Sequence, residues 1–361
     1  MTATELTNRE RVNRALERRD HDRIPRNEHV WRETMERWKG EGLSSDEEFA
    51  TLLRDDLAGL CWSWPVPFPG RHIVLDETPE TRDVRGAMGK IERHWKNKSG
   101  TPEHIEFDCD TRQKWEEVYK PALMAAGIDI DPADAKAKHS VASRAEKWCY
   151  FAGIEPFEAM RQLVGDVILL TAMAEDPDWV LDMSRTYTDL ILRDYDAIWS
   201  AGVEPDGVWV FGDLGYNHGP FFSPRMYEHL LQPDHRRIGH WAHERRKKYI
   251  YHTDGDVRSL IPGLLGAGID CLQPMEAKAG LDIRNLAPQY GDRLTFFGNI
   301  DMTVALTNDL EHVEHEVLSK LEAGMANKGY IFHSDHSVPP QVSWPTYRYM
   351  LELVDRHGNY V

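Results

Sequence analysis

The chain has 361 residues, of which 41% are hydrophobic and 29% charged, and its formal net charge at pH 7 is −17. A surface with this much negative charge repels nucleic acids and anionic membranes, so neither is expected as the principal partner. The sequence contains no run of about 18 apolar residues, so no transmembrane helix is expected.

The amino-terminal residues and the cysteines indicate the cellular compartment. The amino-terminal residues lack the apolar stretch of a signal peptide. The four cysteines are scattered and form no CxxC pair; they are Cys61, Cys109, Cys149 and Cys271. This usage is typical of reduced thiols rather than of a disulfide framework. The sequence therefore predicts a cytoplasmic protein.

The amino-terminal part is expected to be a helical extension. Residues 5–19 have the spacing of an amphipathic helix that Thr7 or Asn8 caps. Pro25 disfavours a helical residue before it, so the chain should be extended there. A first strand is expected over 26–31, with Asn27, Glu28 and His29 near its end.

Residues 61–147 are expected to be an insertion in the fold. Residues 61–70 are rich in Trp, Pro and Phe and predict a loop that borders a pocket. Alternating apolar residues between glycines over 72–110 predict a β-hairpin excursion. Helices are expected over most of 111–147. We treat residues 1–361 as one domain that contains this insertion.

The remaining sequence alternates between short apolar runs and longer amphipathic segments. Short buried strands separated by helices are typical of a parallel barrel. The pattern predicts a single α/β domain of (β/α)8 (TIM) barrel type. The expected strands are 26–31, 57–60, 148–153, 207–212, 248–252, 269–273, 294–299 and 329–333.

Polar residues follow several of these strands at the point where each strand ends. In a parallel barrel the carboxyl ends of all strands meet at one rim, so these side chains should surround one small ligand. Any one of them could instead be a structural cap. The residues are Asp213, Tyr216, Asn217, His218, His252, Asp254, Gln273, Glu276, Asn299, Asp301, His333, Asp335 and His336.

Two kinds of chemistry remain open for this rim. His252, Asp254, Glu276 and His336 form a nitrogen and oxygen donor set that suits zinc or another divalent ion. The same residue types serve equally well as general acids, general bases and substrate-binding groups. The sequence has no HExxH or similarly tight spacing that would decide between them.

A set of short motifs occurs in the same order as in a known family. The motifs are Arg9-Glu-Arg-Val12, Asp22-Arg-Ile-Pro25, Gly212-Asp-Leu-Gly-Tyr-Asn-His-Gly-Pro-Phe-Phe-Ser-Pro224, His252-Thr-Asp-Gly255, Gly268-Ile-Asp-Cys-Leu-Gln-Pro274, Phe297-Gly-Asn-Ile-Asp301, and His336 before Pro339-Pro340. In this order they resemble the uroporphyrinogen decarboxylase-like superfamily, which includes corrinoid- and methylcobalamin-dependent methyltransferases. The resemblance implies a single (β/α)8 barrel with its site at the rim.

Two departures from the family pattern refine what the resemblance implies. Uroporphyrinogen decarboxylases carry an arginine-rich segment after the first strand, where this chain has the acidic stretch Asn27-Glu-His-Val-Trp-Arg-Glu33. The thiol-activating methyltransferases hold zinc with a His-x-Cys-Gly segment and a later Cys. Here Asp254 takes the place of the first Cys and His336 that of the second, which makes a harder metal site.

Three functions follow as hypotheses. The leading one is a methyltransferase that moves a methyl group between a small substrate and a corrinoid (cobalamin) cofactor or corrinoid protein. His252, Asp254 and His336 would hold a metal such as Zn²⁺ or polarise the substrate, and Asp213 and Glu276 would position it or transfer protons. The alternative is a cofactor-free carboxy-lyase, and the third is a non-catalytic binding barrel. A homodimer stays open.

Overall fold

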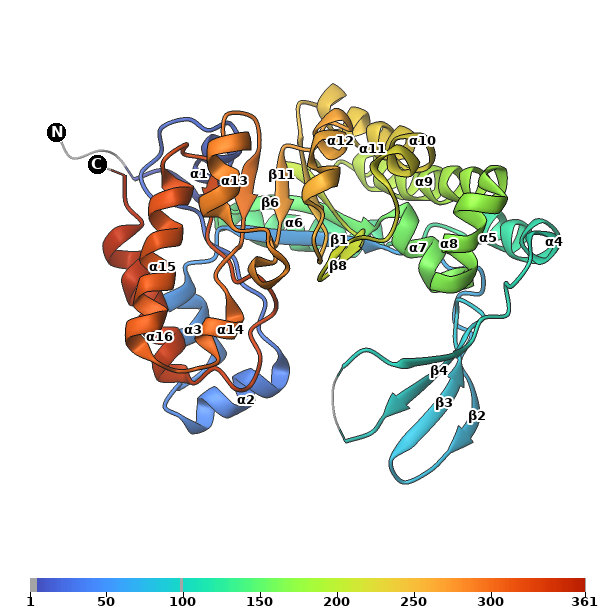
Figure 1. Ribbon diagram of the computed structural model, residues 1–361, viewed down its shortest axis with the longest axis horizontal. Helices are drawn as coiled ribbons and strands as arrows, with labels where there is room; N and C mark the ends of the chain where they lie inside the picture. The colour runs from blue at the N-terminus through green and yellow to red at the C-terminus, as the bar shows by residue number, and fades with distance from the viewer. Residues whose placement is uncertain (1–4, 98–99, 361) are drawn as a thin grey trace.

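A parallel sheet forms the centre of the molecule (Figure 1). The computed structural model describes residues 5–97 and 100–360. Neighbouring strands follow one another along the chain, and every neighbouring pair is parallel. In order across this seven-stranded sheet, the strands are β1 (Leu57–Ser63), β6 (Trp148–Ile154), β7 (Gly207–Phe211), β10 (Lys248–His252), β11 (Cys271–Gln273), β12 (Thr295–Phe297) and β13 (Tyr330–Ile331).

The segment around Arg26 lies between the last strand and the first. Arg26 forms a parallel bridge with Phe332, just beyond β13. On its other side, the N–H of Asp56 donates to the carbonyl oxygen of Arg26 at 2.9 Å. This segment occupies the position of an eighth strand, so the curled sheet has the architecture of the predicted barrel.

The expected first strand is shorter than predicted. Within 26–31, only isolated bridges at Arg26 and Val30 pair with the carboxyl-terminal segment. Pro25 contributes no N–H donor to a ladder, which shortens regular pairing at this end. The strand expected at 57–60 is longer than predicted, because β1 continues to pair with β6 as far as Ser63 and Gly153. The predicted loop of 61–70 therefore begins only at Trp64.

Helices cover the outside of the sheet (Figure 1). The amino-terminal helices are α1 (Asn8–Leu16), α2 (Arg32–Gly40) and α3 (Asp46–Leu53). Those that follow the later strands are α7 (Pro156–Val164), α8 (Asp166–Glu175), α9 (Pro177–Ser200), α10 (Pro224–Leu230), α11 (Gln232–Glu244), α12 (Ile261–Gly266), α13 (Ile283–Tyr290), α14 (Met302–Ala305), α15 (Leu310–Met325) and α16 (Trp344–His357). Among the described residues, no helix is long and apolar enough to cross a membrane.

Helix caps and the core agree with the amphipathic patterns of the sequence. Thr7 and Glu10 form a capping box at the start of α1. Ser45 accepts a hydrogen bond from the N–H of Glu48 at the start of α3. One hydrophobic core cluster takes in residues from Ile24 to Val354.

The insertion between β1 and β6 contains a second sheet. The expected excursion over 72–110 is a four-stranded antiparallel sheet of β2 (Ile73–Glu77), β3 (Thr81–Arg85), β4 (Ile91–Trp95) and β5 (Glu103–Glu106). It is larger than a single hairpin, because its strands pair in sequential order, and it projects away from the barrel (Figure 1). Helices α4 (Arg112–Lys114), α5 (Lys120–Ala125) and α6 (Pro132–Arg144) return the chain to β6.

Candidate active site

A cavity of about 450 Å³ lies at the carboxyl ends of the parallel strands. This volume is near the lower end of the range for small-molecule sites, about 300–1,000 Å³. Its lining residues are Asn27, Glu28, His29, Trp62, Tyr150, Trp209, Phe211, His252, Asp254, Gln273, Pro274, His333, His336 and Ser337.

Strand β10 fixes the position of His252. Its central residues are apolar and fully buried, and β7 and β11 pair with its two edges. The chain then turns at Gly255, which has a φ of 82°. A Cβ atom at Gly255 would lie 2.2 Å from the carbonyl carbon of Gly215, so only glycine permits this turn. The Gly255 N–H donates to Glu276 Oε2 at 2.6 Å, which holds the loop that carries Asp254.

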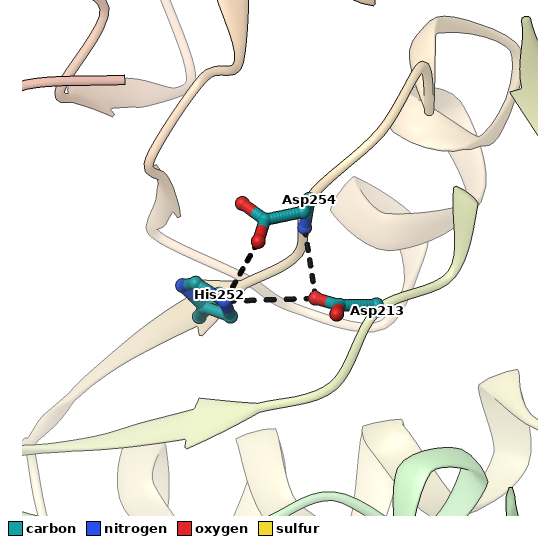
Figure 2. Close-up of side chains that lie close together, drawn as sticks. All are labelled: Asp213, His252 and Asp254. Atoms are coloured by element: carbon teal, nitrogen blue, oxygen red, sulfur yellow. Dashed lines mark hydrogen bonds and ion pairs between the residues drawn. The ribbon is translucent and has the colours of Figure 1, made fainter. Parts of the chain in front are cut away.

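His252 lies between two carboxylates (Figure 2). Its Nδ1 donates to Gln273 Oε1 at 2.5 Å, so its Nε2 is directed to Asp213 and Asp254. Nε2 is 3.6 Å from Asp213 Oδ1 and 3.9 Å from Asp254 Oδ2. The backbone N–H of Asp254 donates to Asp213 Oδ1 at 3.0 Å, which links the loops after β7 and β10.

The surroundings change the proton affinity of all three groups. Burial opposes protonation of His252, but the charges of Asp254 and Asp213 outweigh it and raise the pKa of His252 to about 9. Burial also opposes ionisation of Asp213, yet its contacts with His252 and with the Asp254 N–H lower the pKa of Asp213. For Asp254, burial prevails and raises the pKa. Carboxyl groups whose pKa values are pushed apart are typical of acid–base sites.

A second carboxylate, that of Glu28, lines the same cavity. The Glu28 side chain has no exposed surface. It accepts hydrogen bonds from Ser334 Oγ at 2.6 Å and from the Tyr347 hydroxyl at 2.9 Å. His333 Nε2 lies 3.5 Å from it. The sequence placed Glu28 at the end of the first strand with Asn27 and His29, but it was not among the candidate site residues.

Four imidazoles line the same cavity: those of His29, His252, His333 and His336. His29 Nδ1 lies 2.8 Å from Ser337 Oγ. Burial lowers the pKa of His29, and the neighbouring His333 and His336 lower it further. These surroundings favour the neutral form of His29, which can accept or donate a hydrogen bond.

Aromatic rings form the remaining wall. The Phe211 ring centroid lies 4.9 Å from Trp62, 5.0 Å from Trp209 and 4.9 Å from His252. Tyr150 lies 5.0 Å from Trp209. The Trp-rich segment 61–70 was expected to border a pocket, and its Trp62 does line the cavity. The other aromatic residues of this wall were not predicted. The available signal was the two-residue spacing of Trp209 and Phe211, which places both on one face of β7.

Comparison with known proteins identifies the family. The family model "Uroporphyrinogen decarboxylase (URO-D)" matches residues 153–357, more than half of the chain. The chain belongs to the URO-D family. Among solved structures, a methyltransferase from Methanosarcina mazei superposes with a TM-score of 0.68, at 16% sequence identity, over 98% of this chain and 99% of that one. No curated protein sequence matches significantly.

The structure brings about half of the predicted site residues of this URO-D family protein to the cavity. Those that line it are Asn27, His29, His252, Asp254, Gln273, His333 and His336. Asp213 is not among the lining residues, but its Oδ1 lies 3.6 Å from Nε2 of His252. Tyr216 and Asn217 are exposed on the small hairpin formed by β8 (Gly215–Tyr216) and β9 (Gly219–Pro220), and they are not among the lining residues.

Three other predicted residues hold backbone groups instead. Asn299 is fully buried and donates to the carbonyl oxygens of Met275 and Leu281. Asp301 caps α14. Glu276 binds the Gly255 N–H with one oxygen, and Lys278 Nζ lies 2.9 Å from the other. Strand ends in a barrel need such caps as well as catalytic groups, and the sequence does not separate the two.

The donor set of this URO-D family protein fits a divalent metal ion. Asp213, His252 and Asp254 each offer one ligand atom, and these atoms lie within 4.8 Å of one another. Asp254 Oδ1 is buried without a hydrogen-bond partner in the described chain, which leaves it available to a ligand. The set differs from the predicted one, because Asp213 takes part, whereas His336 is not in the cluster and Glu276 is engaged elsewhere. One nitrogen and two oxygens make a hard site.

Proposed function

We propose that this protein is a methyltransferase that moves a methyl group between a small substrate and a corrinoid. The observation that supports it best is the cavity itself: an acid–histidine–acid group stands beside an aromatic wall, at the rim where barrel enzymes act. Perturbed pKa values in such a cleft favour a catalytic role over a purely binding one.

Of the two reactants, only the small substrate fits the cavity. At about 450 Å³ it holds a small substrate and does not enclose a corrinoid macrocycle. The corrinoid would therefore approach from the open side, as a co-substrate or on a partner protein. The aromatic wall would exclude water and orient the methyl group toward that side.

Within this proposal, each polar residue of the cavity has a role. Gln273 fixes the ring of His252, because its Oε1 accepts a hydrogen bond from the Nδ1–H. Asp213, His252 and Asp254 would hold a divalent metal, which supplies Lewis acidity to the leaving group when bound. His29 and His336, which line the same cavity, would bind the polar part of the substrate.

Family membership alone would equally favour a decarboxylase. A porphyrinogen substrate carries several carboxylates, which need cationic partners. The lining residues identified in the described chain include no lysine or arginine. This composition argues against decarboxylation of a porphyrinogen and for a substrate without several negative charges.

The test is methyl transfer to a reduced corrinoid. Cob(I)alamin would be mixed with the protein and a panel of small methylated compounds, and formation of methylcobalamin followed by absorbance. His252→Ala should reduce the rate by roughly 10²–10⁴-fold and leave the circular dichroism spectrum unchanged. His240→Ala, an exposed histidine of α11, serves as the matched control.

The outcome discriminates among the three hypotheses. Carbon dioxide release from a porphyrinogen, with no change in cobalamin absorbance, would support the decarboxylase. Ligand binding without turnover would support the non-catalytic barrel. Equal rates for His252→Ala and the parent would remove His252 from the mechanism.

A further inference from the structure

The aromatic side chains of the cavity come from three neighbouring strands. They are Trp62 of β1, Tyr150 of β6, and Trp209 and Phe211 of β7. In the order Trp62, Phe211, Trp209, Tyr150, consecutive ring centroids are 4.9, 5.0 and 5.0 Å apart, so the rings form one continuous surface. The face of an aromatic ring carries negative potential, which attracts cations and above all alkylated ammonium groups.

The charged side chains of the cavity favour the same kind of ligand. Two carboxylates line it, those of Glu28 and Asp254, whereas no lysine or arginine does so within the described part of the chain. His252 lies between Asp213 and Asp254, so even its protonated ring leaves this group of three with a net negative charge. The Glu28 side chain has no exposed surface, so water screens its charge little.

Two basic side chains near the site are held by carboxylates of their own. Lys278, whose charge acts on Asp254, has its Nζ 2.9 Å from Glu276 Oε1. Arg161, whose charge acts on Asp213, has its Nη1 2.7 Å from Glu158 Oε2. Neither residue is among those that line the cavity. An anionic substrate would therefore find no cationic partner there, whereas a cation would meet aromatic rings and negative charge.

We propose that the substrate bound in this cavity is a methylated quaternary ammonium ion whose positive charge lies against the aromatic wall. This inference rests on the proposed methyl transfer and names its substrate class. In the transfer, the bond between a methyl carbon and the nitrogen breaks, and its electron pair stays on the nitrogen. An electron pair from the corrinoid forms the new bond to the methyl carbon.

The leaving group of such a substrate is a neutral amine. Its departure requires no proton and no metal, so the inference does not depend on an ion at Asp213, His252 and Asp254. If these residues do hold a divalent ion, the two aspartates balance its charge. Glu28 then still supplies a negative charge to the cavity.

The first test compares two probes of the same shape by isothermal titration calorimetry of the full-length protein. Choline carries a trimethylammonium group, and 3,3-dimethylbutan-1-ol has a carbon atom in place of the charged nitrogen. Choline should bind roughly 10–30-fold more tightly than the alcohol. The preference should persist in the presence of EDTA, because it does not require a metal.

The second test changes the wall and the charge separately. Trp62→Leu removes one ring and keeps an apolar side chain, and Glu28→Gln removes the charge and keeps the size. Each should reduce the preference for choline over the alcohol by at least about threefold. Retained binding of the alcohol shows that the cavity itself is intact. The matched controls, Trp95→Leu on β4 and Glu352→Gln on α16, change exposed side chains and should leave the preference unchanged.

The outcomes separate this inference from the proposed function. Equal affinities for the two probes would overturn the inference, even if another methyl donor formed methylcobalamin. A preference for choline that survives both Trp62→Leu and Glu28→Gln would also overturn it, because the cation would then bind elsewhere. A preference that both variants reduce, without methylcobalamin formation from any donor, would support the ammonium site and contradict the methyltransferase.

Discussion

At the scale of single residues, Asp254 carries the main departure from the family pattern. Its Oδ2 faces His252, and its Oδ1 is buried without a partner in the described chain. If both Asp254 and Asp213 bind the metal, the site is hard and should hold zinc less tightly than thiolates would. If Asp254 only orients His252, its chemistry should affect the metal indirectly.

Two substitutions separate these roles. As a ligand, Asp254→Cys should tighten zinc binding and Asp254→Asn should weaken it, as measured by competition with a chromogenic chelator. As an orienting group, Asp254→Asn would reduce affinity by roughly 10–100-fold and Asp254→Cys would bring no gain. Asp256→Asn, whose parent side chain pairs with Arg258, is the control. If no variant and no parent protein binds a divalent ion, the metal hypothesis is wrong.

Single residues also show how far the sequence predicts the site. The His252 and Asp254 pair was predictable, because a buried strand and a glycine turn leave little doubt where they point. Gly212 was recognised as part of a motif, but the sequence did not show why this position requires glycine. A Cβ there would lie 2.0 Å from Glu155 Cγ, and Glu155 is fully buried beside His235. Contacts between distant strands of this kind leave no local pattern.

At the scale of elements, Asp335 ties three loops together at the rim. Its Oδ1 accepts the N–H of Met302 at 2.9 Å, and its Oδ2 accepts the N–H of Ala277 at 3.1 Å. It thereby joins the end of β13 to the start of α14 and to the loop after β11. Burial raises the pKa of Asp335 to about 6, although both N–H groups favour the ionised form.

This raised pKa predicts a pH-dependent stability. The folded state binds the proton more tightly than the unfolded state, whose carboxyl has a pKa of 3.8. The contribution of Asp335 to stability is therefore largest below pH 3.8, decreases as the pH rises to about 6, and is constant above. The decrease should be on the order of 3 kcal/mol.

Urea unfolding of the parent protein and of Asp335→Asn at pH values from roughly 3.5 to 7 tests this pH dependence. This range brackets the pKa of Asp335 in the unfolded and in the folded state. The difference in unfolding free energy between the two proteins should follow the slope just described. Asn keeps only one acceptor oxygen, so a constant loss of about 1 kcal/mol should add to it. A difference independent of pH would show that Asp335 is not protonated more readily in the folded state.

Elements with strong local patterns were predicted well and those governed by distant pairing were not. Strand β10 matches its expected bounds, and β7 differs by one residue, because aromatic and β-branched runs have few other buried conformations. The segment at 26–31 has mixed polarity and pairs only through Arg26 and Val30. The insertion was underestimated, since its fourth strand has only one apolar residue, Ile105.

At the scale of the whole molecule, α1 closes the barrel at the end opposite the cavity. Val12 and Leu16 belong to the same buried cluster as Leu57, Ile250 and Ile331, which come from three strands. Layers of such side chains make the interior of a small barrel a packed core. The amino-terminal extension predicted from the sequence is thus part of the barrel's packing, a role that its amphipathic pattern alone does not specify.

A buried ion network holds α1 in this position and gives the last prediction. Arg11 is 1% exposed. Its Nε donates to Asp22 at 2.7 Å, and its Nη1 donates to Asp56 at 2.7 Å. Burial would raise the pKa of Asp22, but the hydrogen bonds from Arg11 and from the Leu6 N–H hold it well below its usual range. Arg11→Met leaves the buried Asp56 and the half-buried Asp22 with fewer partners and should lower the unfolding free energy by on the order of 3 kcal/mol. Asp22 contributes its stability above pH 3.8, so the advantage of the parent protein should shrink as the pH falls below that value.

Arg14→Met, on the same helix but with an exposed hydrogen bond, should change stability by less than about 0.5 kcal/mol. If both variants unfold at the same urea concentration as the parent, the network does not anchor α1.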